Sequence, residues 1–156
     1  MSRVRSLRPV KITIAWIGKT RQPAIQVLTE EYVRRISQYT AVRGLALPGE
    51  GVLLGLAERH GQRPAHALVL LDSRGRQFSS EEFAQFLTNH EEHDSRPLVL
   101  AVGPADGFSE QAVHSASFLL SLGKMTLSHE LARVVLLEQV YRALTIRKGH
   151  PYHLGH

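Results

Sequence analysis

Two apolar runs without polar interruption constrain the fold of this chain more than any other feature. The first, residues 67–71, is Ala-Leu-Val-Leu-Leu and is followed by Asp72; the second, residues 97–102, is Pro-Leu-Val-Leu-Ala-Val. A strand with one solvated face alternates apolar and polar residues, whereas a strand buried on both faces does not alternate. We therefore predict that both runs are buried strands of a mostly parallel sheet.

The rest of the chain alternates between strand and helix patterns. Further strands are predicted at residues 11–17, 42–47 and 118–122, and helices at 23–39, 52–59, 79–90, 110–116 and 129–146. A sequence that alternates strands with helices predicts a three-layer α/β domain, with helices on both faces of the sheet.

Short polar signals mark the ends of several elements. Ser79 and Glu82 have the spacing of a capping box, and Ser109 is expected to cap the next helix. Residues 73–76 are expected to form a turn. The apolar face of the first helix is expected to consist of Ile25, Leu28, Tyr32, Val33 and Ile36.

The composition is that of a basic globular protein without cysteine. The chain has 156 residues, a net charge of +5 and a pI near 10.0, and 15 of its 19 basic residues are arginine. Arginine binds phosphate in a planar fork, which favours a nucleic-acid partner, although a solvated surface explains the same excess. We predict a single domain at residues 10–156, preceded by a basic extension at residues 1–9.

The sequence indicates no membrane segment and no cysteine-based site. No apolar run approaches the roughly 18 residues that a membrane span needs, and the basic N-terminus lacks the apolar stretch of a signal peptide. The absence of cysteine excludes disulfides and thiolate metal sites. A cytoplasmic protein is the expectation.

The final helix, capped by Ser128, is apolar on almost every side. Its apolar residues are Leu131, Val134, Val135, Leu136, Leu137, Val140, Tyr141 and Leu144. One side can cover the sheet, and the other then needs a partner, for which a second copy of the chain is the expected one. The alternative is a helix that is fully enclosed in a monomer.

Three loops are expected to meet at the carboxyl ends of the strands, where parallel α/β sheets bind ligands. They follow Leu71-Asp72, begin at Gly103, and cover residues 122–127. Glycines at 103 and 107 allow close approach of the backbone to a ligand, or serve only the turn. The chain has no Walker loop and no G-x-G-x-x-G motif, which argues against a P-loop nucleotidase or a standard dinucleotide enzyme.

Two residues of the last helix are candidates for chemistry. His129 lies in its first turn, where the positive end of a helix favours a neutral ring that can take part in proton transfer; it can equally be a capping or packing residue. Arg142 is suited to bind phosphate, or pairs with Glu138 at i, i+4 spacing.

The C-terminal tail is rich in histidine and aromatic residues. It contains Tyr152 and His153, which can stack on a base, and follows Arg147 and Lys148, which can hold phosphates. A disordered tail is the alternative. A metal site at His150, His153 and His156 is disfavoured, because cysteine and a nearby carboxylate are absent.

The C-terminal third resembles a known family. The pattern comprises residues 122–127, His129, Leu131, Arg133, Glu138-Gln139, Tyr141-Arg142-Ala143 and the ending Gly149-His150-Pro151-Tyr152-His153. It resembles the small bacterial 23S rRNA pseudouridine N3-methyltransferases of the SPOUT class. The resemblance extends from Lys11 and includes Gly18-Lys19, Glu31-Tyr32 and Leu71-Asp72.

This resemblance implies a fold, a cofactor and an assembly. The fold would be an α/β domain with a C-terminal trefoil knot, and the protein would be a homodimer. S-adenosylmethionine (S-adenosyl-L-methionine) would lie in the knot, held by three loops. The corresponding residues here are Leu71, Gly103, Leu122, Gly123, Lys124, Met125, Thr126 and Leu127.

The resemblance also implies a substrate, namely a pseudouridine of 23S rRNA in the assembled 70S ribosome, methylated at N3. The tail of one subunit would help to complete the pocket of the other. The expected positions for base positioning and proton handling are His129, Arg142, Tyr152 and His153. No metal is implied.

Several positions depart from the family pattern. Val102 precedes Gly103 where paired glycines are usual, Ser128 replaces a proline, Glu130 replaces a neutral residue and is expected to repel RNA, and Leu154 replaces a basic residue. Two alternatives therefore remain: a SPOUT methyltransferase with another RNA target, and a ribosome-binding module without turnover.

Overall fold

A single parallel sheet organises the chain. The structure, a computed structural model, describes residues 10–60, 63–150 and 152. The five strands of the sheet lie in the order β2-β1-β6-β5-β7, and every neighbouring pair is parallel. They are β1 (Ile12–Ile17), β2 (Val42–Leu47), β5 (Ala67–Gln77), β6 (Leu98–Val102) and β7 (Phe118–Ser121).

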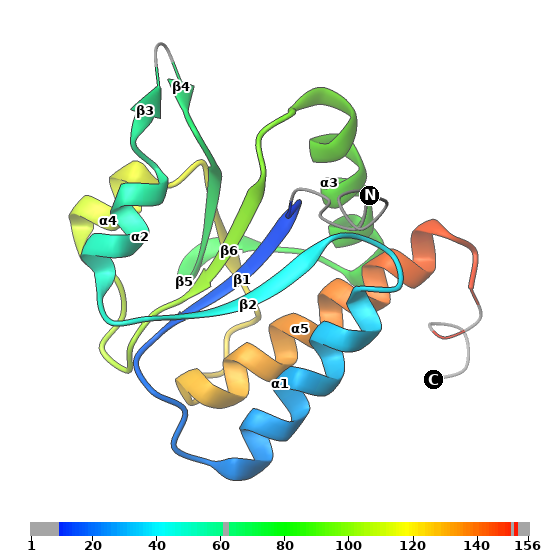
Figure 1. Ribbon diagram of the computed structural model, residues 1–156, viewed down its shortest axis with the longest axis horizontal. Helices are drawn as coiled ribbons and strands as arrows, with labels where there is room; N and C mark the ends of the chain where they lie inside the picture. Colours follow the sequence, from blue (N-terminus) through cyan, green and yellow to red (C-terminus); the bar gives the residue numbers. More distant parts are fainter. Residues whose placement is uncertain (1–9, 61–62, 151, 153–156) are drawn as a thin grey trace, which may run out of the picture.

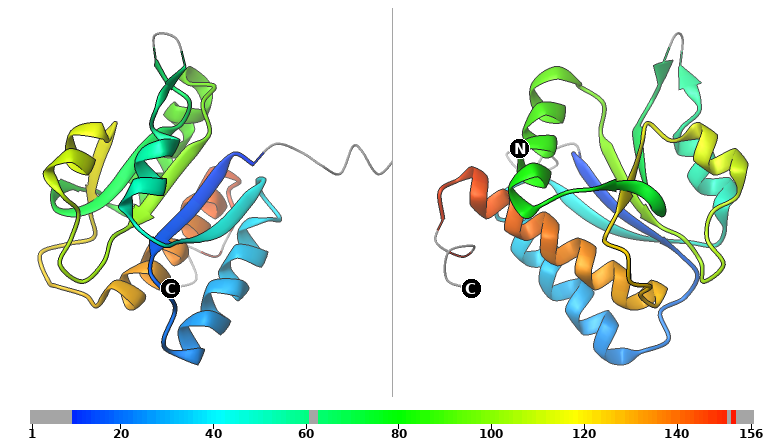
Figure 2. Two further views of the ribbon diagram at one scale, coloured as in Figure 1. Left: turned by 60° about the vertical axis from the view of Figure 1, so that its left-hand side comes forward. Right: turned by 180° about the vertical axis from the view of Figure 1, so that it is seen from behind.

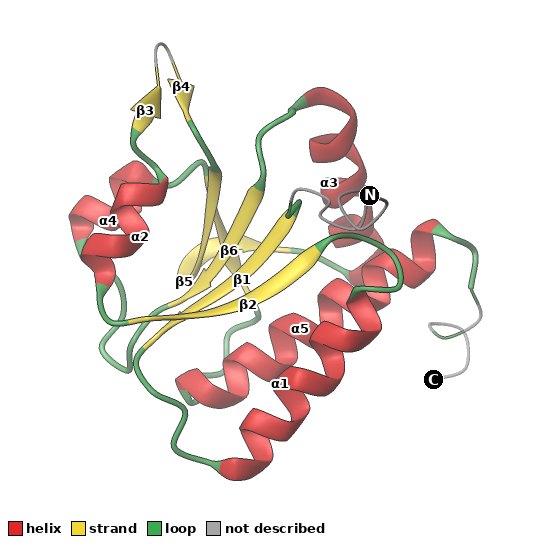
Figure 3. Ribbon diagram, viewed as in Figure 1, coloured by secondary structure: helices red, strands yellow, loops and turns green. Residues whose placement is uncertain are grey.

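Helices cover both faces of the sheet, as predicted (Figures 1 and 3). On one face lie α1 (Pro23–Ile36), α3 (Ser80–His93) and α5 (His129–Arg147); on the other lie α2 (Glu50–Leu56) and α4 (Glu110–Ser115). Figure 2 shows α1 and α5 packed side by side beneath the sheet in both views. Both helices begin at the carboxyl edge of the sheet and run back to the opposite edge.

The core explains why the central strands show no alternation of polarity. In β6, Leu98, Leu100 and Val102 pack in the cluster that faces α1, α3 and α5, while Val99 and Ala101 pack towards α2 and α4. All five are buried. Strands that bury both faces need apolar side chains at every position. The prediction that the two unbroken apolar runs are buried strands is confirmed, since they lie in β5 and β6.

The predicted serine caps are present in the structure. Ser79 accepts the amide of Glu82, whose carboxylate accepts the amide of Ser79 in return. Ser109 accepts the amide of Ala112. Each cap satisfies an amide that lacks a partner in the first turn of its helix.

Two predictions about the middle of the chain are wrong. Residues 73–76 are not a turn but part of β5, which changes register against β7 between Leu71 and Arg76. A Cβ at Gly75 would lie 2.5 Å from the carbonyl carbon of Leu119, so glycine permits a close approach of the two strands here. The helix expected at 52–59 ends at Leu56, and a short antiparallel pair, β3 (Arg59–His60) and β4 (Arg63–Pro64), follows it.

The first helix buries less of its apolar face than predicted. Ile25 and Ile36 are buried, but Leu28 is 40% exposed, and its neighbour Val27 is 64% exposed. The face that contacts α5 is narrower than the sequence pattern, so Leu28 lies outside it. Two apolar residues are thus left on the surface of α1.

The last helix is largely enclosed within its own chain. Leu136, Leu137 and Val140 are fully buried, and α1 and α3 pack against the helix on two sides. Leu131, in contrast, is 51% exposed. The apolar character of α5 therefore does not by itself require a second copy, and its most exposed apolar surface lies at its first turn. No described helix is both long and apolar enough to cross a membrane.

Candidate functional site

Two adjoining cavities open at the carboxyl edge of the sheet. The larger, of about 400 Å³, is lined by Leu71, Val102, Gly103, Pro104, Ala105, Gly107, Phe108, Thr126, Leu127, Ser128, His129 and Ala132. The smaller, of about 270 Å³, is lined by Leu71, Asp72, Ser73, Leu120, Ser121, Leu122, Gly123, Lys124, Met125, Thr126, Leu127 and Ala132. All eight residues expected at the cofactor line one cavity or both.

The loops that form these cavities are shaped by glycine and by local hydrogen bonds. Gly107 and Gly123 have positive φ angles of 84° and 135°, which disfavour other residues. A Cβ at Gly103 would lie 3.0 Å from the ring of Phe108, so glycine allows that ring to close over the loop. The hydroxyl of Ser121 accepts the amide of Gly123 and donates to its carbonyl, which fixes the loop after β7.

A charged pair lies at the edge of the smaller cavity. The guanidinium of Arg74 donates to both carboxylate oxygens of Asp72, at 2.9 Å each, and the Arg74 amide donates at 2.8 Å. These hydrogen bonds hold the pKa of Asp72 below its usual range. The carboxylate is thus ionised beside the cavity, with its direction fixed.

The first turn of α5 connects the larger cavity to the start of α1. Ser128 caps the helix by accepting the amide of Leu131, and His129 is partly buried in the cavity wall. The next residue, Glu130, is only 6% exposed, because its carboxylate turns inward and accepts the amides of Arg21 and Gln22, at 2.8 and 3.1 Å. Those hydrogen bonds lower its pKa. The carboxylate is therefore directed at backbone amides and not at solvent, which argues against the expectation that Glu130 repels RNA.

Arg142 and Tyr152 meet at the other end of α5. Arg142 forms an ion pair with Glu138 at 2.7 Å, and the Tyr152 hydroxyl donates to the same carboxylate, also at 2.7 Å. The Arg142 guanidinium lies over the Tyr152 ring, 4.9 Å from its centroid, and Tyr141 packs edge-on at 4.8 Å. Of the two alternatives for Arg142, the structure shows the pairing with Glu138.

This arrangement fixes the protonation of the tyrosine. Burial, together with the carboxylate of Glu138, raises the pKa of Tyr152 well above its usual range. The same carboxylate raises the pKa of Arg142. Tyr152 is accordingly a neutral hydrogen-bond donor at physiological pH and is not suited to accept a proton as a base.

The expected catalytic residues do not gather in one place within a single chain. Arg142 follows His129 by 13 residues on α5, which corresponds to about 20 Å along a helix. Figure 1 shows the start of α5 beside the carboxyl-edge loops and its C-terminal end on the far side of the molecule. His153 lies outside the described residues.

The sequence pattern assigned no role to Arg133, which is the largest fully buried side chain among the described residues. Its Nη1 donates to the hydroxyls of Thr20 and Thr29, at 2.9 and 3.2 Å, and its guanidinium stacks 4.0 Å from the ring centroid of Trp16. Burial lowers its pKa. An arginine among the apolar residues of the last helix was the available signal.

Only one of the three histidines of the disfavoured metal site lies within the described residues. His150 is described, whereas His153 and His156 lie outside the described residues. Among residues 10–60, 63–150 and 152, no three histidines or carboxylates are close enough to hold a metal ion.

Comparisons with known proteins agree with each other. A family model described as "Predicted SPOUT methyltransferase" matches residues 10–153. The protein named ribosomal RNA large subunit methyltransferase H of Koribacter versatilis is 53% identical over 147 residues, covering 94% of this chain and all of that one. The protein of the same name from Porphyromonas gingivalis is 35% identical, covering 92% and 99%.

Solved structures show the same fold at low identity. A probable methylase family protein from Haemophilus influenzae superimposes with a TM-score of 0.56 at 9% identity, covering 92% of this chain and 70% of that chain. The SpoU methyltransferase AviRb from Streptomyces viridochromogenes, in complex with the cofactor AdoMet, gives a TM-score of 0.54 at 14% identity, covering 92% and 60%. These likenesses establish the fold.

Proposed function

The chain belongs to the SPOUT methyltransferases, in the family of ribosomal RNA large subunit methyltransferase H, and from that premise we propose that it methylates ribosomal RNA with S-adenosylmethionine. The observation that carries this proposal is the pair of cavities at the carboxyl edge of the sheet. All three loops of the site inferred from the sequence contribute to them.

The cavity walls fit S-adenosylmethionine chemically. Leu71, Val102 and Leu127 give the larger cavity apolar walls that suit the flat faces of an adenine, while Gly103 and Gly107 leave the loop backbone without side chains at the cavity wall. When bound, the cofactor supplies an electrophilic methyl group on a sulfonium. We assign its binding to Leu71, Gly103 and the run Leu122, Gly123, Lys124, Met125, Thr126 and Leu127.

Within ribosomal RNA, the proposed site of methylation is N3 of a pseudouridine in 23S rRNA, and the proposed substrate is the assembled 70S ribosome. Methylation at N3 forms an N–C bond and releases the N3 proton, so the protein must orient the base and leave the proton a route to an acceptor. His129 is the expected catalytic residue that lines the cavity within the same chain. Tyr152 and Arg142 are proposed to position the base and its phosphate.

A homodimer accounts for the distance between the two parts of the site. His129 and Arg142 lie about 20 Å apart along α5, so the two residues of one chain cannot both act on one nucleotide. Exposed apolar residues lie in the cavity loop after β7 and in the first turns of α1 and α5, namely Met125, Leu127, Val27, Leu28 and Leu131. We propose that a second subunit covers this surface and brings its own Arg142 and Tyr152 to the cavity.

The departures from the family pattern do not favour a module without turnover. Val102 is buried in the core and also forms part of the wall of the larger cavity. Glu130 directs its charge at backbone amides, as described above. Ser128 still caps α5. These three changes are accommodated with the cavity open, and Leu154 lies outside the described residues.

The test is a methyl-transfer assay with labelled S-adenosylmethionine on unmethylated 70S ribosomes, on large subunits and on protein-free 23S rRNA. Calorimetric binding of the cofactor analogue S-adenosylhomocysteine runs in parallel. Incorporation into ribosomes, with little into free rRNA, is expected. Tight cofactor binding without incorporation into any of the three would move the substrate elsewhere, and absence of cofactor binding would exclude the proposed enzyme.

A further inference from the structure

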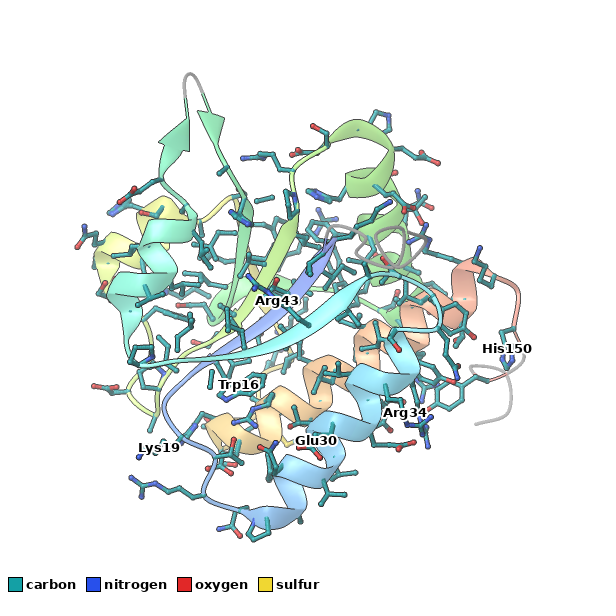
Figure 4. All side chains as sticks on the ribbon, viewed as in Figure 1. Trp16, Lys19, Glu30, Arg34, Arg43 and His150 are labelled. Atoms are coloured by element: carbon teal, nitrogen blue, oxygen red, sulfur yellow. The ribbon has the colours of Figure 1, made fainter. Side chains whose placement is uncertain are left out.

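The loop between β1 and α1, residues 18–22, presents two cations beside the cavities. Lys19 and Arg21 are both exposed, and Figure 4 shows the labelled side chain of Lys19 at the edge of the molecule, away from the sheet. Neither side chain forms an ion pair or hydrogen bond with any residue of the described chain. On the neighbouring helix, in contrast, Arg34 and Arg35 both form ion pairs with the single carboxylate of Glu31, at 2.7 Å each.

Two side chains of helix α5 hold this loop. The carboxylate of Glu130 accepts the amides of Arg21 and Gln22, and the guanidinium of Arg133 donates to the hydroxyl of Thr20. Both Glu130 and Arg133 are nearly inaccessible, at 6% and 1% exposure. The anchors are therefore buried and fixed, while the two cationic side chains of the loop point to solvent.

The Arg133 anchor also reaches both elements that flank the loop. Its guanidinium stacks on Trp16 in β1 and donates to Thr29 in α1. A buried cation is costly unless its contacts offset the desolvation, and an apolar side chain would fill the position at lower cost. The contacts made here tie the loop, the strand before it and the helix after it to the first turns of α5.

The anchored loop lies next to the proposed site of methyl transfer. Glu130 directly follows His129, which lines the larger cavity. Ile17, which precedes the loop, lines a third, separate depression together with Pro104, Gly107 and Phe108. The last three of these residues also line the larger cavity. Figure 1 shows the β1–α1 loop, the loop after β6 and the start of α5 at the same end of the molecule.

We propose that Lys19 and Arg21 bind RNA phosphates flanking the nucleotide that enters the cavity, and that Glu130 and Arg133 are positioning residues for this loop. This inference rests on the proposed function. Lysine and arginine bind phosphate without reading sequence, and such contacts set the register of the nucleic acid. Because Glu130 is directed at backbone amides, its negative charge fixes the loop and does not neutralise its cations.

The test compares the double variant Lys19→Ala/Arg21→Ala with wild-type protein on unmethylated 70S ribosomes. The binding constant K for RNA falls with salt concentration, and each lost phosphate contact makes the negative slope of log K against log salt less steep by about 1. The slope for the double variant is therefore expected to be less steep than that of wild type by about 2. KM for ribosomes rises, whereas kcat and the affinity for S-adenosylhomocysteine are unchanged. An unaltered salt slope together with an unaltered KM would overturn the proposal.

The matched control is Lys11→Ala/Arg43→Ala. It removes the same charge from two exposed residues at the amino-terminal ends of β1 and β2, which is the edge of the sheet opposite the loop. The salt slope of this control is expected to remain that of wild type. An equal loss in the control would mean that net charge, not this loop, attracts the RNA, and would overturn the assignment. A wild-type protein that transfers no methyl group would instead refute the proposed function, so the two failures are distinct.

The positioning role has its own test in Glu130→Gln, which keeps both cations. A glutamine weakens the clamp on the amides of Arg21 and Gln22, so KM for ribosomes is expected to rise at unchanged kcat and unchanged S-adenosylhomocysteine affinity. If this variant lost stability but kept the wild-type KM, Glu130 would be structural only, and its positioning role would be rejected.

Discussion

Replacing Gly103 by alanine tests the cofactor site at a single methyl group. The added Cβ would lie 3.0 to 3.1 Å from three atoms of the Phe108 ring, closer than ordinary van der Waals contact. Phe108 is itself part of the wall of the larger cavity. The ring must therefore move by a few tenths of an ångström, and overpacking of this kind costs about 1–3 kcal/mol.

In the free protein the displaced Phe108 ring can relax into the open cavity that it lines, so the cost is expected to return when the cofactor fills that space. A penalty of about 1–3 kcal/mol corresponds to a loss of roughly 5- to 150-fold in affinity. The assay is calorimetric titration with S-adenosylhomocysteine, with urea unfolding to measure any change in global stability separately. Methyl transfer should fall at subsaturating cofactor and partly recover at saturation.

Gly55→Ala is the matched control. It makes the same substitution within α2, where a Cβ would meet nothing within 4 Å, and is expected to leave affinity unchanged and to stabilise the helix by up to about 1 kcal/mol. Wild-type cofactor affinity in Gly103→Ala, with the variant folded, would refute the assignment of this cavity to S-adenosylmethionine.

Three further predictions concern stability, pH and assembly. Gly75→Ala places a Cβ 2.5 Å from the backbone of Leu119, and urea unfolding should show a loss of about 1–3 kcal/mol; unchanged stability would contradict the close approach of β5 and β7. The folded-state pKa of Glu130 is lowered, so its stabilisation is present above the usual glutamate pKa and is lost as pH falls through the lowered value. The stability gap between wild type and Glu130→Gln should therefore close on acidification, and a pH-independent gap would contradict this role. Mixing inactive His129→Ala with inactive Tyr152→Ala subunits should restore about one quarter of wild-type activity through hybrid dimers, and no recovery would contradict the shared site.

The sequence predicts the sheet well, because its strands obey a local rule. Buried parallel strands must be apolar on both faces, so residues 98–102 can be recognised as a buried strand without knowledge of the strands beside them. Serine caps are equally local, and Ser79, Ser109 and Ser128 all cap the helices expected of them. The three loops at the cavities follow from the same reasoning, since the carboxyl ends of parallel strands meet at one edge.

Features that depend on distant contacts are not visible in the sequence. The extension of β5 through Gly75 depends on the approach of Leu119, 44 residues later. The inward turn of Glu130 depends on amides more than 100 residues earlier in the chain. A knot is likewise a global property, so it stays a prediction based on family resemblance.

The last helix shows how a correct pattern led to an incomplete argument. Four of its eight apolar residues are buried and three are partly buried, but by α1 and α3 of the same chain as well as by the sheet. A hydrophobic pattern reports burial and does not identify the covering element. The dimer is now supported by different observations, namely the exposed apolar residues at the cavity end and the separation of His129 from Tyr152.

The most direct test of the account is identification of the methylated nucleoside. Unmethylated 70S ribosomes are incubated with the protein and labelled S-adenosylmethionine, and the 23S rRNA is digested and analysed by mass spectrometry. The account predicts label in N3-methylpseudouridine at a single position. Label in a different nucleoside would contradict the proposed substrate, and ribosomes that remain unlabelled by a protein that binds the cofactor would contradict the central claim.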